Sequence, residues 1–374
     1  MQIMLKTLVP APSVWEDFMR SYAKALCCAL VLLLQAWCAS AQEANVTVVA
    51  SGLNGPRGLT FGPDGALYVA EAGSGGDSST VGTSCQQVPP PVGSYHGGPT
   101  ARVSRISNGE RTTVVEGLPS GLSSLPSGDT VGAADVKFLG HDLYVLVAGG
   151  GCSHGNPRAP AGIVRAKIQQ GTWSYIADLS AYLRSHPVAN PEPGDFEPDG
   201  TLFTMDLPNG HFYAAEPNHG EVIRVNPGGH AERLIDISAT QGHVVPTAIA
   251  FRNGFFYVGA LSTFPIAPGS ANIYKISEEG KIVGVISGLT TVTGLTFDAA
   301  GRLYALELSA APGFPTPGEG KLVRVNGPGQ LEDIVTHLVV PTGLSTGPDG
   351  ALYISNFGAA LPGFGQILRV TIPD

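Results

Sequence analysis

The chain has 374 residues, of which 50 are glycine and 30 are proline, and only 14% are charged. Glycine and proline at this frequency interrupt helices and favour short strands joined by turns. The formal net charge of −9 argues against a nucleic-acid or anionic-membrane partner, because both need a basic surface.

Residues 1–41 are predicted to be a secretory signal peptide. Arg20 and Lys24 precede an apolar run of 13 residues at 25–37, and the small residues at 39–41 form a typical cleavage site. This run is too short to span a bilayer comfortably, and a buried helix is the alternative interpretation. Translation would start at Met1 or Met19. Residues 42–374 would then be a periplasmic or secreted domain with no membrane span, and we expect a monomer.

A short strand occurs six times along the mature chain. Residues 63–71 read Pro-Asp-Gly-Ala-Leu-Tyr-Val-Ala-Glu, and residues 348–356 read Pro-Asp-Gly-Ala-Leu-Tyr-Ile-Ser-Asn. Such copies at long intervals indicate a repeat protein. The four weaker copies carry the pairs Leu143-Tyr144, Phe212-Tyr213, Phe256-Tyr257 and Leu303-Tyr304.

Each repeat divides into four strands, with turn residues between β-branched and aromatic runs. The sixth repeat ends without its fourth strand, and residues 46–49 near the N-terminus match the missing one. We therefore expect residues 46–49 to pair beside Leu368 and to close a ring. The predicted fold is an all-β, six-bladed β-propeller covering residues 42–374, in which neighbouring blades supply each other's core.

Unequal loops point to one face of this propeller. The spacing from Tyr68 to Arg105 is 37 residues, whereas the spacing from Tyr213 to Arg224 is only 11. Loops between second and third strands share a face with the connections between blades, predicted at 119–130 and 178–197. We expect the functional site to lie on this loop-rich face, because binding residues concentrate on loops held by a rigid scaffold.

Cys85 and Cys152 are the two cysteines that remain after signal removal, and both fall in loops of this face. In an exported chain they are predicted to form a disulfide bond. A metal site formed with His96 and His154 is the alternative, although the spacing matches no compact zinc motif.

Several stretches resemble known propeller families. Residues 52–61 and 63–73 resemble the opening of the ScyD/ScyE family of exported proteins, and residues 215–225 are similar to an NHL-type repeat. The resemblance implies a six-bladed propeller in the periplasm or outside the cell. It brings no established activity and no catalytic residues.

Two more distant resemblances supply enzymatic alternatives. Gluconolactonase-like hydrolases use a divalent metal on the propeller axis, with an acidic residue on the first inner strand, where this chain has Arg57. Soluble quinoprotein sugar dehydrogenases have a similar Pro-x-Gly-Leu-x-Phe-x-Pro-Asp-Gly opening, but their histidine and quinone-binding cations have no clear counterparts here. The main prediction is thus an exported propeller that binds a small molecule or a partner on its loop-rich face, with no activity assignable. The alternatives are a metal-dependent lactonase-like hydrolase and a quinone-dependent sugar dehydrogenase.

Polar residues are expected to line the channel mouth on the loop-rich face. Such groups could hold Ca²⁺ or another divalent metal, or provide a general base. The alternative is that they bind the loop backbone, with Glu71 paired to Arg57. The catalytic residue is unknown, and the predicted ligand-binding set is Arg57, Glu71, Asp135, Glu216, Asn218, Glu307 and Asn356.

Other patterns are assigned structural roles. The Pro-Asp-Gly runs at Asp64, Asp199 and Asp349 are interpreted as turns. The basic residues of the third strands are interpreted as outward-facing charges, and His96, His154 and His219 as solvated loop histidines. The sequence has no P-loop, no Gly-x-Gly-x-x-Gly after a strand and no His-Glu-x-x-His, which argues against an NTPase or a nicotinamide enzyme.

Overall fold

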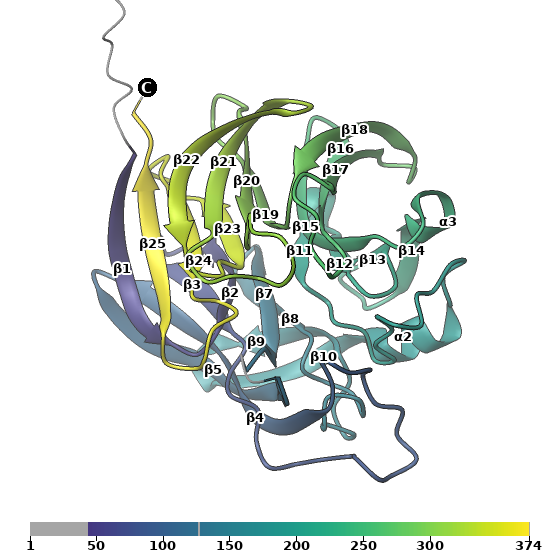
Figure 1. Ribbon diagram of the computed structural model, residues 1–374. Coiled ribbons are helices and arrows are strands. Elements are labelled where there is room, and N and C mark those ends of the chain that lie inside the picture. Colours follow the sequence, from purple (N-terminus) through teal and green to yellow (C-terminus); the bar gives the residue numbers. More distant parts are fainter. Residues whose placement is uncertain (1–43, 126–127, 374) are drawn as a thin grey trace, which may run out of the picture. The chain divides into compact units, whose positions relative to one another are not determined.

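The structure, a computed structural model, describes residues 44–125 and 128–373 (Figure 1). The predicted signal peptide and start codon lie outside these residues. Residues Ala44–Ile372 belong to one compact unit. No helix within the described residues is long and apolar enough to cross a membrane.

Six antiparallel sheets surround a common axis, as predicted for a six-bladed β-propeller. Each inner strand contacts the inner strand of the next blade, and β23 contacts β2, so the inner strands form a ring. These inner strands are β2 (Pro56–Phe61), β7 (Ala133–Leu139), β11 (Thr204–Asp206), β15 (Val245–Arg252), β19 (Val292–Phe297) and β23 (Gly343–Thr346).

The second strands carry the repeated Leu/Phe-Tyr pair. They are β3 (Leu67–Glu71), β8 (Asp142–Val147), β12 (Phe212–Glu216), β16 (Phe255–Leu261), β20 (Leu303–Glu307) and β24 (Leu352–Asn356). The third strands are β4 (Tyr95–Ser107), β9 (Gly162–Lys167), β13 (Glu221–Val225), β17 (Ala271–Ser277), β21 (Gly320–Gly327) and β25 (Gly365–Thr371).

The outer strands are more exposed than the strands inside them. β18 alternates half-buried and exposed residues, whereas every residue of β3 is buried. The outer strands are β5 (Glu110–Ser123), β10 (Thr172–Asp178), β14 (Ala231–Asp236), β18 (Ile282–Leu289), β22 (Gln330–Leu338) and, in the last blade, β1 (Asn45–Leu53).

The strand nearest the N-terminus lies in the blade nearest the C-terminus. β1 pairs with β25, with Val46 opposite Val370 and Val48 opposite Leu368. The order in this sheet is β1-β25-β24-β23. The outer edge of β25 is therefore covered by a strand from the other end of the described chain.

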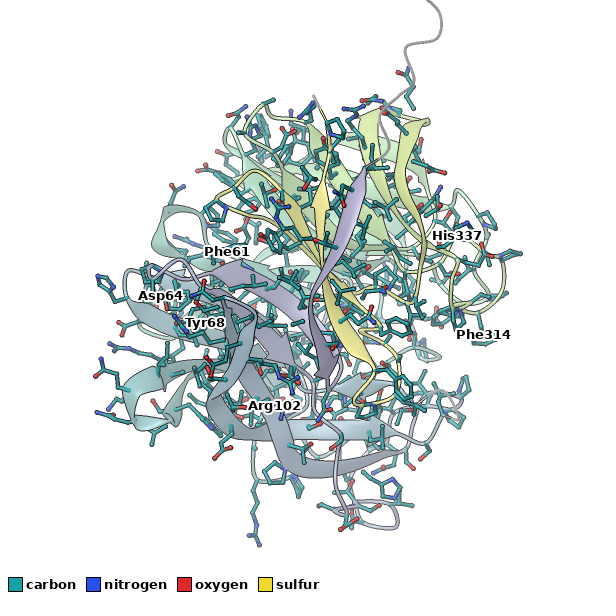
Figure 2. All side chains as sticks on the ribbon, turned by 90° about the vertical axis from the view of Figure 1, so that its left-hand side faces the viewer. Phe61, Asp64, Tyr68, Arg102, Phe314 and His337 are labelled. Carbon is teal, nitrogen blue, oxygen red and sulfur yellow. A yellow bond between two sulfur atoms is a disulfide. The ribbon has the colours of Figure 1, made fainter. Side chains whose placement is uncertain are left out.

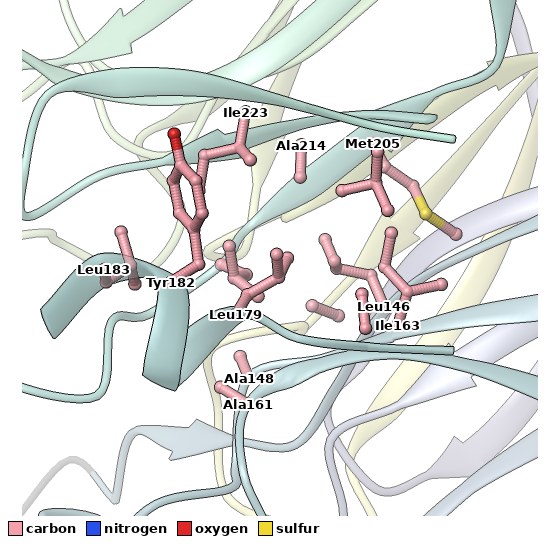
Figure 3. Packing of buried hydrophobic residues seen from close by; sticks show 14 of the residues in the cluster. Leu146, Ala148, Ala161, Ile163, Leu179, Tyr182, Leu183, Met205, Ala214 and Ile223 are labelled. Atoms are coloured by element: carbon pink, nitrogen blue, oxygen red, sulfur yellow. The ribbon is translucent and has the colours of Figure 1, made fainter. Parts of the chain in front are cut away.

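The core lies between adjacent blades. One apolar cluster combines β3 and β4 of the first blade with β7 and β8 of the second. Another joins the second and third blades and includes α2 (Leu179–Ser185), whose Leu179, Tyr182 and Leu183 pack near Ile223 of β13 (Figure 3). Burying both faces of each sheet removes a large apolar area from water and stabilises the ring.

The predicted turn role of Asp64 is confirmed. Its carboxylate accepts hydrogen bonds from Ala66 N and, at 3.2 Å, from the Tyr68 hydroxyl, and it forms an ion pair with Arg105 (Figure 2). Asp349 repeats this arrangement with Tyr353 and Arg369. The third-strand cations are thus turned outward to partners near the tight turns, or, as for Arg224 and Arg324, to a glutamate of the outer strand.

The first blade differs from the prediction. Residues 119–130 were expected to be a loop, but β5 runs on to Ser123, and β6 (Thr130–Val131) adds a fifth strand. β4 extends to match, with Tyr95 opposite Ser123. The predicted connection at 178–197 is also not wholly irregular, because it contains α2. The short helical segments η1 (Ile168–Gln170), η2 (Pro208–Gly210) and α3 (Ser238–Gln241) complete the fold.

Candidate functional site

Four of the predicted channel-mouth residues bind the backbone of neighbouring loops. Each ends a second strand, is buried, and accepts a hydrogen bond from a loop N–H group. Such bonds satisfy donors that would otherwise be buried without a partner. The donor–acceptor pairs are Asn54 with Glu71 (2.7 Å), Thr201 with Glu216 (2.9 Å), Thr290 with Glu307 (2.5 Å) and Val339 with Asn356 (2.8 Å).

The expected pairing of Glu71 with Arg57 is wrong. Glu71 forms an ion pair with Arg102, the residue opposite it on β4, at 2.7 Å, and also accepts a bond from Ser104. Arg57 instead pairs with Asp129 at 3.1 Å and donates to the Thr130 carbonyl at 2.6 Å. The difference arises because Glu71 faces its neighbour on β4, whereas Arg57 reaches the segment at Asp129 and Thr130, where β6 begins.

A cavity of about 320 Å³ lies along the central channel and is lined by residues of all six inner strands. Asp135 lines it, but both of its oxygens are occupied. Lys137 Nζ lies 2.9 Å from each of them, and Thr204 Oγ1 and Met205 N each donate to Oδ2 at 2.9 Å. Asp206 also lines the cavity; burial raises its pKa, and it accepts bonds from the Leu207 and Phe251 N–H groups.

This donor set does not fit a divalent metal on the axis. Within residues 44–125 and 128–373, no group of three or more His, Cys, Asp or Glu side chains is arranged to hold a metal ion. A cation, Arg57, occupies the first inner strand, and the oxygens of Asp135 are engaged. Three threonine hydroxyls near the mouth, Thr247, Thr293 and Thr342, donate to carbonyls of the next blade.

One serine of the axial cavity, Ser345, lies in a sequence match to a hydrolase motif. Gly343-Leu344-Ser345-Thr346-Gly347 matches the Gly-x-Ser-x-Gly spacing of a nucleophile elbow. Ser345 lies within β23, opposite Tyr353 of β24, and not at a strand-to-helix turn. The match is therefore part of a strand and carries no hydrolase assignment.

A second cavity lies on the loop-rich face, and we call it the loop cavity. Its volume is about 560 Å³. The walls come from three elaborated segments: the loop after β3 with Cys85, the loop after β8 with Cys152, and the connection after β10 with Asp199. The loop after Tyr68 and the connection at 178–197, both predicted to be long, thus meet at one cavity together with the loop that carries Cys152.

A disulfide bond joins two of these walls, as predicted. Cys85 and Cys152 are linked, with their Cα atoms 6.0 Å apart. The alternative metal site with His96 and His154 is wrong, because both sulfurs are consumed by the bond. His154 is buried against Glu197, while His96 is exposed.

The charges of the loop cavity are unequally satisfied. Asp199 is buried and accepts bonds from Ser153 N, Ser153 Oγ and Arg184 Nη1, at 2.9, 2.8 and 2.7 Å. Asp178 caps α2 by accepting from Ala181 N. Arg158 is exposed and forms no ion pair within the described residues, and Arg184 uses one nitrogen for Asp199. The cavity therefore presents two guanidinium groups with free donors, whereas Asp199 is fully engaged and Asp178 uses one oxygen as the helix cap.

Two of the predicted solvated histidines are buried. His154 Nε2 lies 3.0 Å from Glu197 Oε2, and His154 Nδ1 lies 2.7 Å from the Gly150 carbonyl. His219 stacks on Phe196 at a centroid distance of 4.9 Å. The solvated interpretation is thus wrong for His154 and His219, because a neighbouring connection folds over both.

Asn218 belongs to the same region. Its amide nitrogen donates to the Asp195 carbonyl at 2.9 Å, and its buried Oδ1 has no hydrogen-bond partner among the described residues. The predicted set is therefore divided. Asn218 lies beside the connection, Asp135 lines the axial cavity, Arg57 binds Asp129 and Thr130, and the strand-end residues bind backbone.

Sequence reasoning missed Arg158, Arg184, Glu197 and His243. Only the length of the connection at 178–197 pointed toward them. Their proximity depends on how three distant loops fold together, which no local pattern specifies.

Neither a family model nor a curated protein matches the sequence. Solved structures do match, and the three described below are at low identity. Regucalcin from Agrobacterium tumefaciens, described as a calcium-binding protein, is 14% identical with a TM-score of 0.53, over 87% of this chain and 92% of that one. A putative oxidoreductase (glucose dehydrogenase) from Thermus thermophilus is 16% identical with a TM-score of 0.52, over 88% and 100%.

A gluconolactonase from Xanthomonas campestris is 11% identical with a TM-score of 0.51, over 90% of this chain and 93% of that one. At such identities the likeness concerns the fold alone. Together with the six sheets described above, these similarities show that the chain is a six-bladed β-propeller.

Proposed function

We propose that this protein is a binding propeller that takes a small carboxylate-bearing molecule in the loop cavity. The observation that carries the proposal is the cavity itself. It has a volume of about 560 Å³, within the range of small-molecule sites, and is built from the elaborated loops of the loop-rich face.

The charges of the cavity select the class of ligand. Arg158 and Arg184 offer planar donors that suit a carboxylate, and the buried aspartate of the wall, Asp199, is already satisfied by Ser153 and Arg184. A ligand anion would therefore gain partners at these guanidinium groups, while Arg184 neutralises the buried Asp199. The disulfide between Cys85 and Cys152 keeps two walls together before the ligand arrives, which reduces the entropy lost on binding.

The proposal includes export to the periplasm or the cell exterior. The disulfide favours an oxidising compartment, and the N-terminal apolar run has the pattern of a signal peptide. Membership of the ScyD/ScyE family is part of the same proposal and rests on the resemblance of residues 52–73. A monomer without a nucleic-acid partner is in keeping with the acidic net charge.

The lactonase-like and quinone-dependent alternatives are supported by the propeller fold and by no more specific feature. Both would act near the axis, where Arg57 and Lys137 are cationic and Asp135 has no free oxygen. Calcium or another divalent metal would therefore need a donor set different from the one at the channel mouth.

Calorimetry with matched ligands tests the proposal. Succinate and its neutral diamide would be titrated into the oxidised mature protein at pH 6. We expect heat of binding with succinate alone, and a raised melting temperature, since a ligand at 100 times its Kd stabilises a protein by about 2.7 kcal/mol.

Variants locate the site. Arg158→Ala should weaken succinate binding about tenfold or more, because a lost charge-assisted contact costs about 1.5–3 kcal/mol. Arg165→Ala is the matched control, since Arg165 is on β9 of the same blade, pairs with Asp142 and does not line the cavity. Equal binding of succinate and diamide, or equal loss in both variants, would refute the assignment.

A further inference from the structure

Three histidines from three different loops contact one short segment, residues 195–197, which we call the clasped segment. His154 comes from the loop after β8, His219 from the loop after β12, and His243 from the connection after α3. Their contacts are with the Glu197 side chain, the Glu197 carbonyl and the Asp195 side chain, at 3.0, 3.2 and 2.9 Å.

The contact between His154 and Glu197 requires one proton more than a neutral imidazole and an ionised carboxylate carry together. Both nitrogens of His154 face acceptors, namely the Gly150 carbonyl and Glu197. A neutral imidazole donates from one nitrogen only, so either the ring is charged or Glu197 is protonated. His154 is fully buried, with the Tyr95 ring edge-on to it at 5.0 Å. Loss of this proton would leave two acceptors facing each other without water.

The second contact has the same requirement. His219 Nε2 faces the Glu197 carbonyl, and this bond places the hydrogen on Nε2. Nδ1 then has a lone pair that faces Glu221 Oε1 at 3.9 Å, and both atoms are buried without a hydrogen-bond partner among the described residues. A proton on either atom would relieve this opposition.

The clasped segment adjoins the loop cavity. Pro198 and Asp199, which follow it directly, line the cavity. On its other side the connection begins with α2, which is anchored in the apolar core (Figure 3). The cavity wall is thus fixed at α2 and, beyond Asp199, at β11, and residues 195–197 are held between these anchors by histidine contacts.

We propose that His154, His219 and His243 form a clasp, made proton-dependent by the His154 and His219 contacts, that sets the position of residues 195–199 and thereby regulates access to the loop cavity. The regulatory part rests on the proposed function of that cavity. The clasp is closed while the shared protons are present and loosens when they are lost.

Burial and neighbouring charges shift the pKa values of the clasp in one direction, upward. Burial disfavours a charged His154, but the hydrogen bond and charge of Glu197 outweigh this and raise the pKa of His154. Burial likewise raises the pKa of Glu197 and Glu221, although His154 and Arg233 oppose the shift. All three groups therefore bind protons more tightly in the folded clasp. Stability from these protons is present at acidic pH and lost as the pH rises through the raised values.

Other charged groups also face the clasp. Glu216 accepts a hydrogen bond from the backbone N–H of His219 at 2.6 Å, and the Arg233 side chain donates to Glu221. Asp199 lies near His154 and is paired with Arg184, and Asp195 pairs with His243 at a more exposed position. Arg57 and Asp129 lie close to Tyr95.

Hydrogen exchange of the ligand-free, oxidised protein tests the clasp. Protection factors of a peptide spanning residues 190–201 would be measured at pH 6 and pH 8.5, after correction for the intrinsic pH dependence of exchange. We expect the protection factor to fall about tenfold at the higher pH, since losing one hydrogen bond between buried groups changes an opening equilibrium by about this factor.

Glu197→Gln is the decisive variant. Its amide can donate to neutral His154 without a shared proton, so we expect protection that changes less than about threefold over the same pH range. His211→Gln is the control, because His211 follows a tight turn on the opposite face, where its ring contacts the Asn209 carbonyl, and the variant should behave as the wild type. Constant protection in the wild type, or an equal fall in Glu197→Gln, would overturn the clasp.

The two proposals fail separately. The exchange measurement needs no ligand, so absent succinate binding would leave the clasp result standing. Succinate titrations at pH 6 and 8.5 then test regulation: we expect the affinity to change with pH in the wild type and to stay constant in Glu197→Gln. An affinity with the same pH dependence in both proteins would contradict the regulatory role.

Discussion

Glu221 offers the sharpest test of the buried charges beside the loop-rich face. It begins β13, and its Oε2 accepts a hydrogen bond from Arg233 Nε at 2.5 Å. Its Oε1 is buried without a partner among the described residues, 3.9 Å from His219 Nδ1. Burial raises the pKa of Glu221 from the usual 4.5 to about 7, against the opposing effect of Arg233.

The sign of the resulting pH dependence follows from this shift. A carboxyl group whose folded pKa is raised keeps its proton in the folded state after the unfolded state has ionised. Its contribution to stability is therefore present below the unfolded pKa and is lost as the pH rises toward 7. Between pH 5 and pH 8 this loss amounts to about 2.5 kcal/mol in the free energy of unfolding.

Glu221→Gln should remove this loss. The amide oxygen can still accept from Arg233, and the amide nitrogen can donate to His219 Nδ1, so the packing is preserved without a titrating group. Urea unfolding at pH 5 and pH 8 would measure the free energies. We expect the wild type to lose about 2.5 kcal/mol more than the variant between these pH values.

Glu232→Gln is the control for this measurement. Glu232 lies on β14 of the same blade and forms an exposed ion pair with Arg224, so its substitution should leave the pH profile unchanged. Parallel profiles of the wild type and Glu221→Gln would refute the reasoning about Glu221.

Further expectations concern the disulfide, the strand-end residues, the ring and metals. Replacing Cys85 and Cys152 by serine should lower the free energy of unfolding by about 2–4 kcal/mol in urea titrations, and an unchanged value would contradict a structural disulfide. Asn356→Ala leaves the Val339 N–H without its acceptor and should cost about 1–3 kcal/mol, whereas Asn356→Asp should restore most of the loss. Deleting residues 44–53 uncovers the edge of β25, so we expect a lower melting temperature and concentration-dependent association by light scattering; a stable monomer would argue against ring closure by β1. Dialysis against a chelator should leave the melting temperature unchanged, and a large drop would indicate a structural metal.

The blade architecture was predictable because similar turn and strand residues recur from blade to blade. The Leu-Tyr strand after a Pro-Asp-Gly turn occurs at both ends of the chain, and in both places Asp, Tyr and Arg form the same cluster. The extension of β5 to Ser123 was not predictable in this way. Residues 117–123 contain Gly, Pro and Ser, which indicate a loop, and their strand forms only because β4 lengthens beside them.

The site was less predictable because its residues act through tertiary contacts. A strand-end glutamate such as Glu307 has the same local sequence whether it binds a ligand or a backbone N–H. The burial of His154 depends on Glu197, 43 residues further along the chain, folding over it. Only the loop lengths and the two cysteines indicated where these contacts would gather.

A crystal structure of the oxidised protein grown with succinate at pH 6 would test the central claim most directly. We predict density for the dicarboxylate in the loop cavity, with a carboxylate group against Arg158 or Arg184. Density along the axis beside Lys137, with an empty loop cavity, would contradict the assignment of this face.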